Sequence, residues 1–372
     1  VTGDHSGRMQ LIKLDGICHL AMLTDKSIDL YPFSRKTITK PVQIDHPEAG
    51  GRRIATSDID RDGIEDLVCM GTDKVTCFWG STHGYDPQRA VHFDVAAAQD
   101  VAVGDVTGDG LPDIAVAVHR TGNSYAAQSR VYVNSKSGLD EIRFVELPTS
   151  GASQVHIADL DHDGANDVIF TCGMGGRASL NPPVRVYLGS RDGDYEVGRH
   201  MDLPAVSAAG GAMADFNDDG YVDLFVANLY EGMSREGQRS PIYLGGPDGL
   251  RADRRWELPT EFVHIAATAD VNRDGYLDLV LGAAASGGTT RVWMGGPNGF
   301  SAEHTQPIPL GPVDGLHIAD VDRNGYVDII YVAFQSNETF IVPGDRHGFH
   351  PDRKIALPMP LGGAGVDMAD LD

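Results

Sequence analysis

Acidic and amide side chains recur along the chain at fixed offsets, at positions 1, 3, 5 and 9 of a nine-residue stretch. Residues 159–167 read DLDHDGAND, so the carboxylates of Asp159, Asp161, Asp163 and Asp167 lie close together in sequence. Neighbouring carboxylates repel one another, and a cation between them removes that cost. Oxygen ligands without Cys or His select a hard divalent cation. The first chemistry that this pattern predicts is therefore metal binding.

Six full copies of the loop are present, and they begin at Asp58, Asp105, Asp159, Asp215, Asp270 and Asp320. Position 6 is Gly in every copy, which permits the positive φ of a tight turn around an ion. The backbone carbonyl at position 7 adds a further expected ligand. Loop by loop, the predicted ligands are Asp58, Asp60, Asp62, Ile64 and Asp66; Asp105, Thr107, Asp109, Leu111 and Asp113; Asp159, Asp161, Asp163, Ala165 and Asp167; Asp215, Asn217, Asp219, Tyr221 and Asp223; Asp270, Asn272, Asp274, Tyr276 and Asp278; Asp320, Asp322, Asn324, Tyr326 and Asp328.

The six loops differ in charge. Thr107 replaces an acid at position 3, and Asn217, Asn272 and Asn324 keep an oxygen but lose a charge. Six or seven oxygen ligands at flexible distances suit Ca²⁺ better than the smaller, octahedral Mg²⁺. We expect about six structural Ca²⁺ ions, whose 12 positive charges would bring the formal net charge from −23 to about −11. A solvated acidic turn is the alternative, but it does not require acids at four fixed offsets in six copies.

Short predicted strands surround each loop. A strand ending in a small residue precedes it, an apolar strand such as DVIFTC follows it, and two further strands are separated by Gly-bearing turns. The loops start 47 to 56 residues apart, and helical periodicity is absent. One four-stranded unit cannot bury both of its faces, so neighbouring units must stack. Four strands per period of this length are typical of an all-β β-propeller.

The N-terminal part fits a diverged copy of the unit, because DGICHLAMLTDKSIDLY from Asp15 aligns without gaps with DGIEDLVCMGTDKVTCF from Asp62. We expect one propeller domain over residues 1–372 with seven four-stranded antiparallel blades. A C-terminal strand on the N-terminal blade would close the ring and leave no open sheet edge. The alternative is eight blades with a truncated last copy at Asp370. The expected blades span residues 1–49, 50–97, 98–150, 151–206, 207–261, 262–312 and 313–360, and the closing strand spans 361–372.

The loops and their strand context resemble the FG-GAP/VCBS repeat family, the integrin-α-type β-propellers. That family carries a D-x-[DN]-x-[DN]-G-x-x-D calcium loop between the first and second strands of a blade. Residues 282–296, GAAASGGTTRVWMGG, are similar to the family's Gly-Ala-Pro stretch, with Ala284 in place of Pro. The resemblance covers essentially the whole chain and implies the fold and the calcium loops. It does not define an activity, because one fold hosts many functions.

Composition restricts the partners. A net charge of −23 without a Lys/Arg cluster argues against nucleic acid and anionic membranes. No apolar run is long enough to span a bilayer, and no signal peptide precedes VTGDHSGR, although a leader could already be removed. Loops of this kind usually need micromolar to millimolar Ca²⁺, and no redox or nucleotide-binding motif is present, so we expect an extracellular, cell-surface or periplasmic protein. Cys69 and Cys77 flank a turn and could form a disulfide, but buried free thiols are the favoured interpretation for the four cysteines.

The loops between second and third strands, at the end of the blades opposite the metal loops, vary most. Those at residues 119–129, 172–183 and 228–240 are long and belong to consecutive blades, which predicts a raised rim. The candidate ligand-binding residues there are His119, Arg120, Tyr125, Arg177, Asn181, Tyr230, Arg235 and Arg239. Arg and Tyr suit an acidic or sugar ligand, and solvated loop residues are the alternative.

His156, His317 and Asp367 occupy equivalent positions three residues before a metal loop. They could form a cluster near the axis, but packing between blades is the favoured interpretation.

Three functions remain open. A binding or adhesion module for a protein or glycan is favoured, and further domains of a longer chain are among the expected partners. A polysaccharide lyase or glycoside hydrolase with its site on the same face is the second, although no GxSxG, HExxH or nucleotide-binding motif is present. A structural domain of a surface protein is the third. The sequence leaves catalytic residues unassigned.

Overall fold

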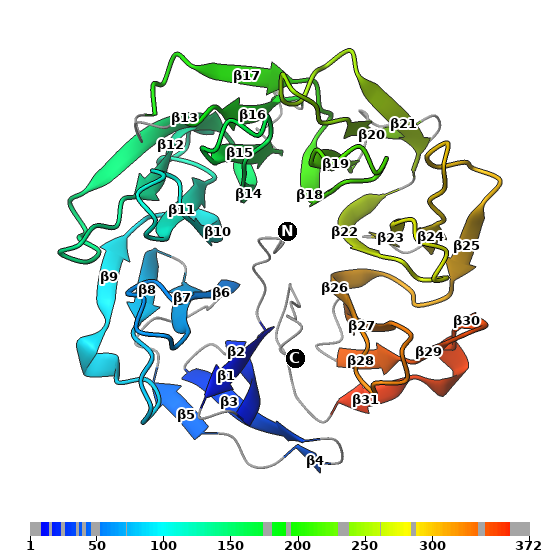
Figure 1. The fold of residues 1–372 in the computed structure, drawn as a ribbon, viewed down its shortest axis with the longest axis horizontal. Helices are drawn as coiled ribbons and strands as arrows, with labels where there is room; N and C mark the ends of the chain where they lie inside the picture. The colour runs from blue at the N-terminus through cyan, green and yellow to red at the C-terminus, as the bar shows by residue number, and fades with distance from the viewer. Residues whose placement is uncertain are drawn as a thin grey trace.

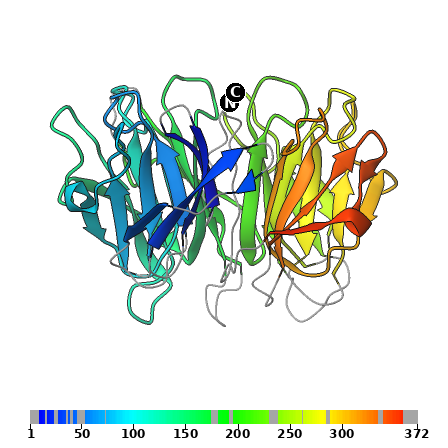
Figure 2. The ribbon, with the colours of Figure 1, turned by 90° about the horizontal axis from the view of Figure 1, so that it is seen from below.

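The computed structural model describes residues 9–14, 17–23, 27–34, 37–38, 42–45, 53–71, 73–173, 181–190, 195–229, 238–260, 262–283, 288–333 and 339–357. These residues form antiparallel sheets arranged as the blades of a ring (Figure 1). Seen from the side, the ring is a short cylinder with loops at both ends (Figure 2). In the part of the chain that is described, no helix is long and apolar enough to cross a membrane.

Six sheets are four-stranded blades, and each follows the chain order from the axis outward. Their strands are β6 (Arg53–Ser57), β7 (Asp66–Met70), β8 (Lys74–Phe78), β9 (Val91–Asp94); β10 (Ala98–Gly104), β11 (Asp113–Val118), β12 (Ala126–Tyr132), β13 (Phe144–Ser150); β14 (Ala152–Ala158), β15 (Asp167–Cys172), β16 (Val184–Tyr187), β17 (His200–Leu203); β18 (Ala208–Ala214), β19 (Asp223–Asn228), β20 (Arg239–Tyr243), β21 (Arg255–Pro259); β22 (Val263–Ala269), β23 (Asp278–Ala283), β24 (Thr290–Trp293), β25 (Thr305–Ile308); and β26 (Val313–Ala319), β27 (Asp328–Ala333), β28 (Thr339–Val342), β31 (Ile355–Leu357). Two short 3₁₀ turns, at Pro87–Arg89 and Pro351–Arg353, and the small hairpin of β29 (Gly344–Asp345) and β30 (Gly348–Phe349) complete these blades.

The N-terminal sheet has five strands: β1 (Met9–Leu14), β2 (Ile17–Leu23), β3 (Ser27–Ser34), β4 (Thr37–Ile38) and β5 (Val42–Asp45). It lies in the ring between the β6–β9 blade and the blade of β26 to β31 (Figure 1). The long strand β3 pairs with β5 through Leu30 and Val42, and its far end pairs with β4 through Phe33 and Ile38. The extra strand therefore follows from the length of β3.

The prediction of a β-propeller built from four-stranded antiparallel blades is confirmed. The prediction of seven such blades is wrong in this form, because six are four-stranded and the N-terminal sheet is five-stranded. The expected closing strand at 361–372 and the truncated copy at Asp370 lie outside the described residues. The closure of the ring and the eight-blade alternative thus stay predictions.

The core lies between the blades. The second strand of each four-stranded blade is buried along its whole length, except at the last residue of β27. Apolar strands such as DVIFTC suit this place, because a strand covered on both faces needs apolar residues at every position. An aromatic residue on the third strand fills the gap to the next sheet, and Tyr132, Tyr187 and Tyr243 are each at most 1% exposed. Complete burial of a large side chain contributes roughly 1.5–3 kcal/mol.

Polar side chains tie the innermost strands of successive blades together. Asp100 on β10 forms an ion pair with Arg53 on β6, with 3.2 Å between Nε and Oδ1, and its Oδ2 accepts a hydrogen bond from the Val155 N–H on β14. On β14, Gln154 Oε1 accepts from the Gly211 N–H of β18 at 2.7 Å. Each of these acceptors follows a register shift at the start of its strand, which is typical of a β-bulge that redirects a side chain.

Candidate metal centre

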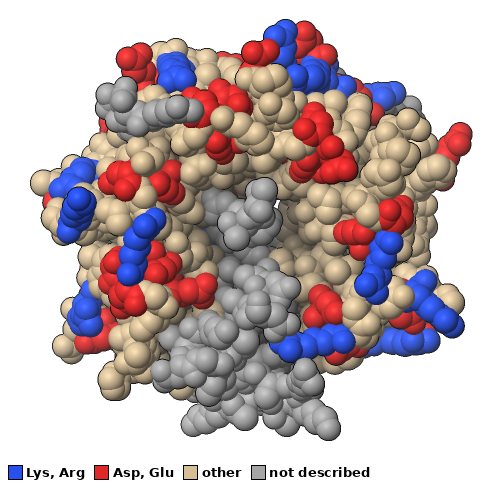
Figure 3. Space-filling view, viewed as in Figure 1, with Lys and Arg blue, Asp and Glu red and all other residues tan. Residues whose placement is uncertain are grey.

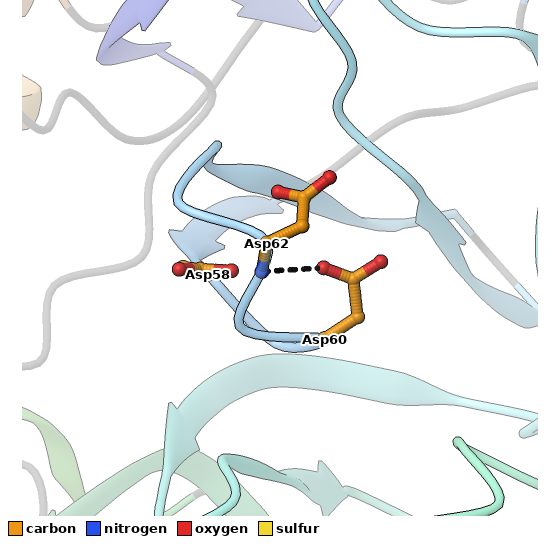
Figure 4. Close-up of side chains that lie close together, drawn as sticks. All are labelled: Asp58, Asp60 and Asp62. Carbon is orange, nitrogen blue, oxygen red and sulfur yellow. Dashed lines mark hydrogen bonds between the residues drawn. The ribbon is translucent and has the colours of Figure 1, made fainter.

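Three carboxylate groups come together in the loops between first and second strands. They are Asp58, Asp60 and Asp62; Asp159, Asp161 and Asp163; and Asp320, Asp322 and Asp328, and in each group one oxygen per residue lies within 4.8 Å of the others. In Figure 4 the first group surrounds the bend between β6 and β7. Oxygens this close can share one cation. These acidic groups can therefore bind a metal.

Backbone N–H groups hold the carboxylates in place. In the loop at Asp159, the Gly164 N–H donates to Asp159 Oδ2 at 3.0 Å, and the Ala165 N–H donates to Asp163 Oδ1 at 2.8 Å. The Asp163 N–H is shared between Oδ1 of Asp159 and Oδ1 of Asp161, both at 3.1 Å. The loops at 215, 270 and 320 repeat this arrangement. The side chains at positions 1, 3 and 5 are thus oriented by the loop itself.

Two residues of each loop adopt a positive φ. The expected one is Gly at position 6, for example Gly220 at 89°. The second is position 4, where His162 has a φ of 58° and Arg273 a φ of 63°. The sequence did not reveal position 4, because five of the six residues there are not Gly. The sequence feature that could have indicated this turn is the spacing of the ligand residues. Side chains at positions 3 and 5 can converge only if the residue between them turns sharply.

Several loop oxygens are buried and accept no hydrogen bond from the described residues: Asp58 Oδ1, Asp105 Oδ1 and Thr107 Oγ1. Burying a polar atom without a partner is costly, and a bound cation would remove this cost. In the four other loops the corresponding Oδ1 accepts the position-5 N–H. The donor set of hard oxygens fits a divalent cation, and Thr107 keeps a buried hydroxyl oxygen at a position where other loops have an acid or an amide.

The aspartate at position 9 clamps the loop to the rest of its blade. Asp66 Oδ2 accepts the Ile59 N–H at 2.8 Å, and its Oδ1 accepts the Gly80 N–H at 2.7 Å, beyond the third strand. Asp113, Asp167, Asp223, Asp278 and Asp328 repeat both bonds. A carboxylate has further lone pairs, so the predicted role as a metal ligand stays a prediction beside this structural one.

Burial raises the pKa of these position-9 carboxyls. The pKa rises to about 6 for Asp66, Asp113 and Asp223 and to about 7 for Asp167, and it also rises for Asp278 and Asp328. Desolvation is the main cause, and the two backbone hydrogen bonds oppose it. Neighbouring loop carboxylates add a smaller upward effect. Positive charge at the loop would counter both contributions that raise the pKa.

Consecutive loops touch one another through positions 4 and 7. The ring of His162 stacks on Tyr221 of the next blade with 4.6 Å between centroids. The guanidinium of Arg273 lies 5.2 Å from the ring centre of Tyr326. The position-7 residues, chosen for their carbonyl groups, thus also carry contacts between blades. In Figure 3 the acidic side chains form separate groups over successive blades, not one continuous patch.

At the other end of the blades, five of the predicted rim residues are described: His119, Arg120, Tyr125, Asn181 and Arg239. The rings of His119 and Tyr125 pack edge to face at 5.1 Å. Arg120, Asn181 and Arg239 are exposed. Arg177, Tyr230 and Arg235 lie outside the described residues. The structure brings together His119 and Tyr125 of this set, and the role of the rim stays a prediction.

The remaining candidates do not form a site in the described residues. His156 is buried on β14 and His317 lies on β26, which are innermost strands of blades that are not neighbours, and Asp367 lies outside the described residues. Cys69, Cys77 and Cys172 are buried free thiols, as the favoured interpretation held. The side chain of Cys18 is not described.

Comparison with protein families matches the FG-GAP-like repeat over residues 58–116, 105–170, 159–226 and 270–331. These segments cover more than half of the chain, and each begins at one of the acidic loops. The chain therefore belongs to the FG-GAP-like repeat family. The predicted resemblance is confirmed at this level.

Curated relatives include integrin alpha-V of Gallus gallus, 26% identical over 224 residues (54% of this chain and 22% of the relative). Integrin alpha pat-2 of Caenorhabditis elegans is 27% identical over 225 residues (49% and 17%). The chain thus spans about a fifth of the length of these relatives. Among solved structures, a functionally unknown protein from Desulfotomaculum acetoxidans DSM 771 has a TM-score of 0.53 at 13% identity, over 86% of this chain and 89% of that one. This last similarity concerns the fold alone.

Proposed function

We propose that this chain is an extracellular, calcium-stabilised propeller that acts as a binding or adhesion module for a protein or glycan. The repeated acidic loop is the observation that carries this proposal. Buried oxygens without hydrogen-bond partners in the first two loops and the tight carboxylate groups in three loops support a resident cation. The names of the integrin relatives support an adhesion role.

Ca²⁺ is the proposed ion, at about six per chain, held by positions 1, 3 and 5 with the position-7 carbonyl and the position-9 aspartate. When bound, the ion would neutralise clustered charge and fix each loop; it is given no catalytic step. The test is elemental analysis of the protein after dialysis against trace Ca²⁺ and Mg²⁺ together. About six Ca²⁺ per chain supports the proposal, and no bound metal, or Mg²⁺ in its place, contradicts it.

The ligand would bind the loops between second and third strands of the β10–β13, β14–β17 and β18–β21 blades. His119 and Tyr125 form a packed pair there, and exposed Arg120 and Arg239 supply charge-assisted donors. The test is a screen of glycans and of cell-surface protein ectodomains in calcium, with Tyr125→Ala and Arg239→Ala beside wild type. Loss of a captured ligand in both variants supports the rim. The same mixtures, assayed for depolymerised glycan, test the enzyme alternative.

We also propose that residues 361–372 add a closing strand to the N-terminal sheet. An open edge in a ring would expose unpaired backbone groups. Removing these residues should lower the melting temperature of the full chain and increase its tendency to associate. An unchanged melt and a monodisperse truncated protein would argue for a ring that closes without them.

A further inference from the structure

A groove between the β18–β21 and β22–β25 blades differs from the corresponding places at the β10–β13 and β14–β17 blades. It encloses a cavity of about 270 Å³ lined by Pro259, Thr260, Val263, Leu281, Thr289, Arg291, Trp293, Ala302 and Thr305. This volume lies just below the usual range for drug-sized ligands and suits a single sugar ring. The groove is on the flank of the propeller and includes none of the acidic loops or predicted rim residues.

The arginine in this groove occupies a repeated position on the third strand. Arg130, Arg185 and Arg291 each lie two residues before the aromatic side chain that fills the space between blades. In the β10–β13 blade, Arg130 faces Glu146 across the strands and forms an ion pair with it at 3.5 Å. In the β14–β17 blade, Arg185 faces Asp202, and the two form a bidentate pair at 2.8 and 2.9 Å.

These two arginines also bridge to the preceding blade. Arg130 Nη1 donates to the carbonyl of Asp94 at 3.1 Å, and Arg185 Nη1 donates to the carbonyl of Pro148 at 3.3 Å. Both carbonyls belong to the outermost strand of the preceding blade. Tyr187 adds a hydroxyl that donates to the Pro148 carbonyl. The guanidinium in each of these blades is therefore neutralised and bridges to its neighbour.

Arg291 lacks these partners. Its cross-strand neighbour is Pro307, and its side chain makes no ion pair, hydrogen bond or ring contact with any residue that the structure describes. Trp293 replaces the aromatic tyrosine, so no phenol reaches the carbonyl of the preceding blade. The side chain of Arg291 is exposed beside a cavity whose walls carry the hydroxyl-bearing residues Thr289 and Thr305. Thr260 also lines the cavity, but its hydroxyl is buried and bonded to Ser240 Oγ at 2.7 Å.

We propose that this groove binds a carboxylated sugar, a uronic acid unit, with Arg291 pairing with its carboxylate. A guanidinium holds a carboxylate with two parallel charge-assisted hydrogen bonds. Threonine hydroxyls both donate and accept, as ring hydroxyls require. Because Arg291 has no cross-strand acid, its guanidinium is available to a ligand. The ligand carboxylate would take the place that Glu146 and Asp202 hold in the β10–β13 and β14–β17 blades. In a chain of net charge −23, a lone arginine also provides a local point of attraction for an anion.

The experiment measures D-glucuronate binding to the full chain by titration of the tryptophan indole ¹H–¹⁵N signals at moderate salt. D-glucose and acetate test whether the ring and the carboxylate are both needed. Arg291→Gln removes the charge and keeps the length of the side chain. Arg130→Gln is the matched control, because it changes the same repeat position in a blade that already holds an acid.

Glucuronate should shift one indole signal and bind at least about tenfold more tightly than either glucose or acetate. Arg291→Gln should weaken binding at least about tenfold, with an unchanged melting temperature, and Arg130→Gln should leave binding within about twofold. The proposal is overturned if wild type shows no saturable shift, if acetate binds as well as glucuronate, or if Arg291→Gln binds as wild type does. Because the rim loops are not involved, these results are independent of the proposed adhesion function.

Discussion

The loops at the two ends of the blades differ: one set repeats from blade to blade, and the other set varies. The loops between first and second strands repeat one backbone path, with the same acceptor at position 1, the same glycine at position 6 and the same buried aspartate at position 9. The segments between the second and third strands differ in length and sequence from blade to blade. Repetition at one end serves the scaffold, and variation at the other leaves room for recognition.

Each loop also contains two kinds of aspartate, which differ in burial and in hydrogen bonding. Asp66 and its equivalents lie in the core and accept backbone N–H groups from two directions. Asp60 and Asp62 are exposed, and among the described residues they accept hydrogen bonds from within the loop, as Figure 4 shows for the bond from the Asp62 N–H to Asp60. The buried aspartate joins the loop to the blade, and the exposed aspartates are the predicted ligands of an ion.

Removal of divalent cations should give the largest effect. A site whose Kd is a hundredth of the free calcium concentration contributes about 2.7 kcal/mol to the folded state. With several such sites, EDTA should lower the melting temperature by more than about 10 °C relative to 2 mM Ca²⁺. Scanning calorimetry in both buffers measures the shift. Equal melts, together with elemental analysis that finds no metal, would refute the calcium scaffold.

Substitution of the buried aspartate should be the next largest effect and should not need metal. Asp167→Ala leaves the Leu160 and Gly189 N–H groups without their acceptor, and each buried unsatisfied group costs about 1–3 kcal/mol. The free energy of unfolding in urea should therefore fall by about 2–5 kcal/mol, even in EDTA.

Asp161→Ala is the matched control in the same loop. Asp161 accepts one loop N–H, so this variant should lose less than about 1.5 kcal/mol in EDTA and should show its main loss in calcium. Equal losses in EDTA for the two variants would show that position 9 is no more structural than position 3.

Substitution of the loop glycine should have a smaller effect. Gly220 has a φ of +89°, and a Cβ added there meets no atom within 4 Å. Gly220→Ala therefore tests backbone strain alone and should cost about 1–3 kcal/mol in urea unfolding. Asp218→Asn, at φ 57° in the same loop, should be nearly neutral, since Asn tolerates the left-handed region. A neutral Gly220→Ala would mean that the loop has another low-energy path.

The sequence predicted the repeat, the strands around it and the position-6 glycine, because each follows from local chemistry at a fixed period. It did not predict the turn at position 4, where residues such as Arg61 and Arg323 carry no mark of a positive φ. The double role of Asp66 was also hidden, since its second donor, Gly80, lies 14 residues away beyond the third strand. The fifth N-terminal strand forms because β3 extends beyond its pairing with β5 and pairs there with β4. The sequence pattern alone does not determine the length of β3.

Acid should affect the metal-free and the metal-bound protein in opposite directions, and this is the smallest expected effect. Burial raises the folded-state pKa of Asp66, Asp113 and Asp223 to about 6 and that of Asp167 to about 7, above the usual value of 3.8. A raised pKa means that the folded protein binds protons more tightly than the unfolded chain. In EDTA, this contribution to stability is complete below pH 4 and is lost as the pH rises through 6 to 7.

The melting temperature in EDTA should therefore be a few degrees higher at pH 5 than at pH 7.5. In calcium the order should reverse, because the ion needs ionised carboxylates and protons compete with it. Asp167→Asn removes the group with the highest of these pKa values and should reduce the slope in EDTA. The same slope sign in both buffers would contradict the assignment of these carboxyls to a site where protons and metal exclude each other.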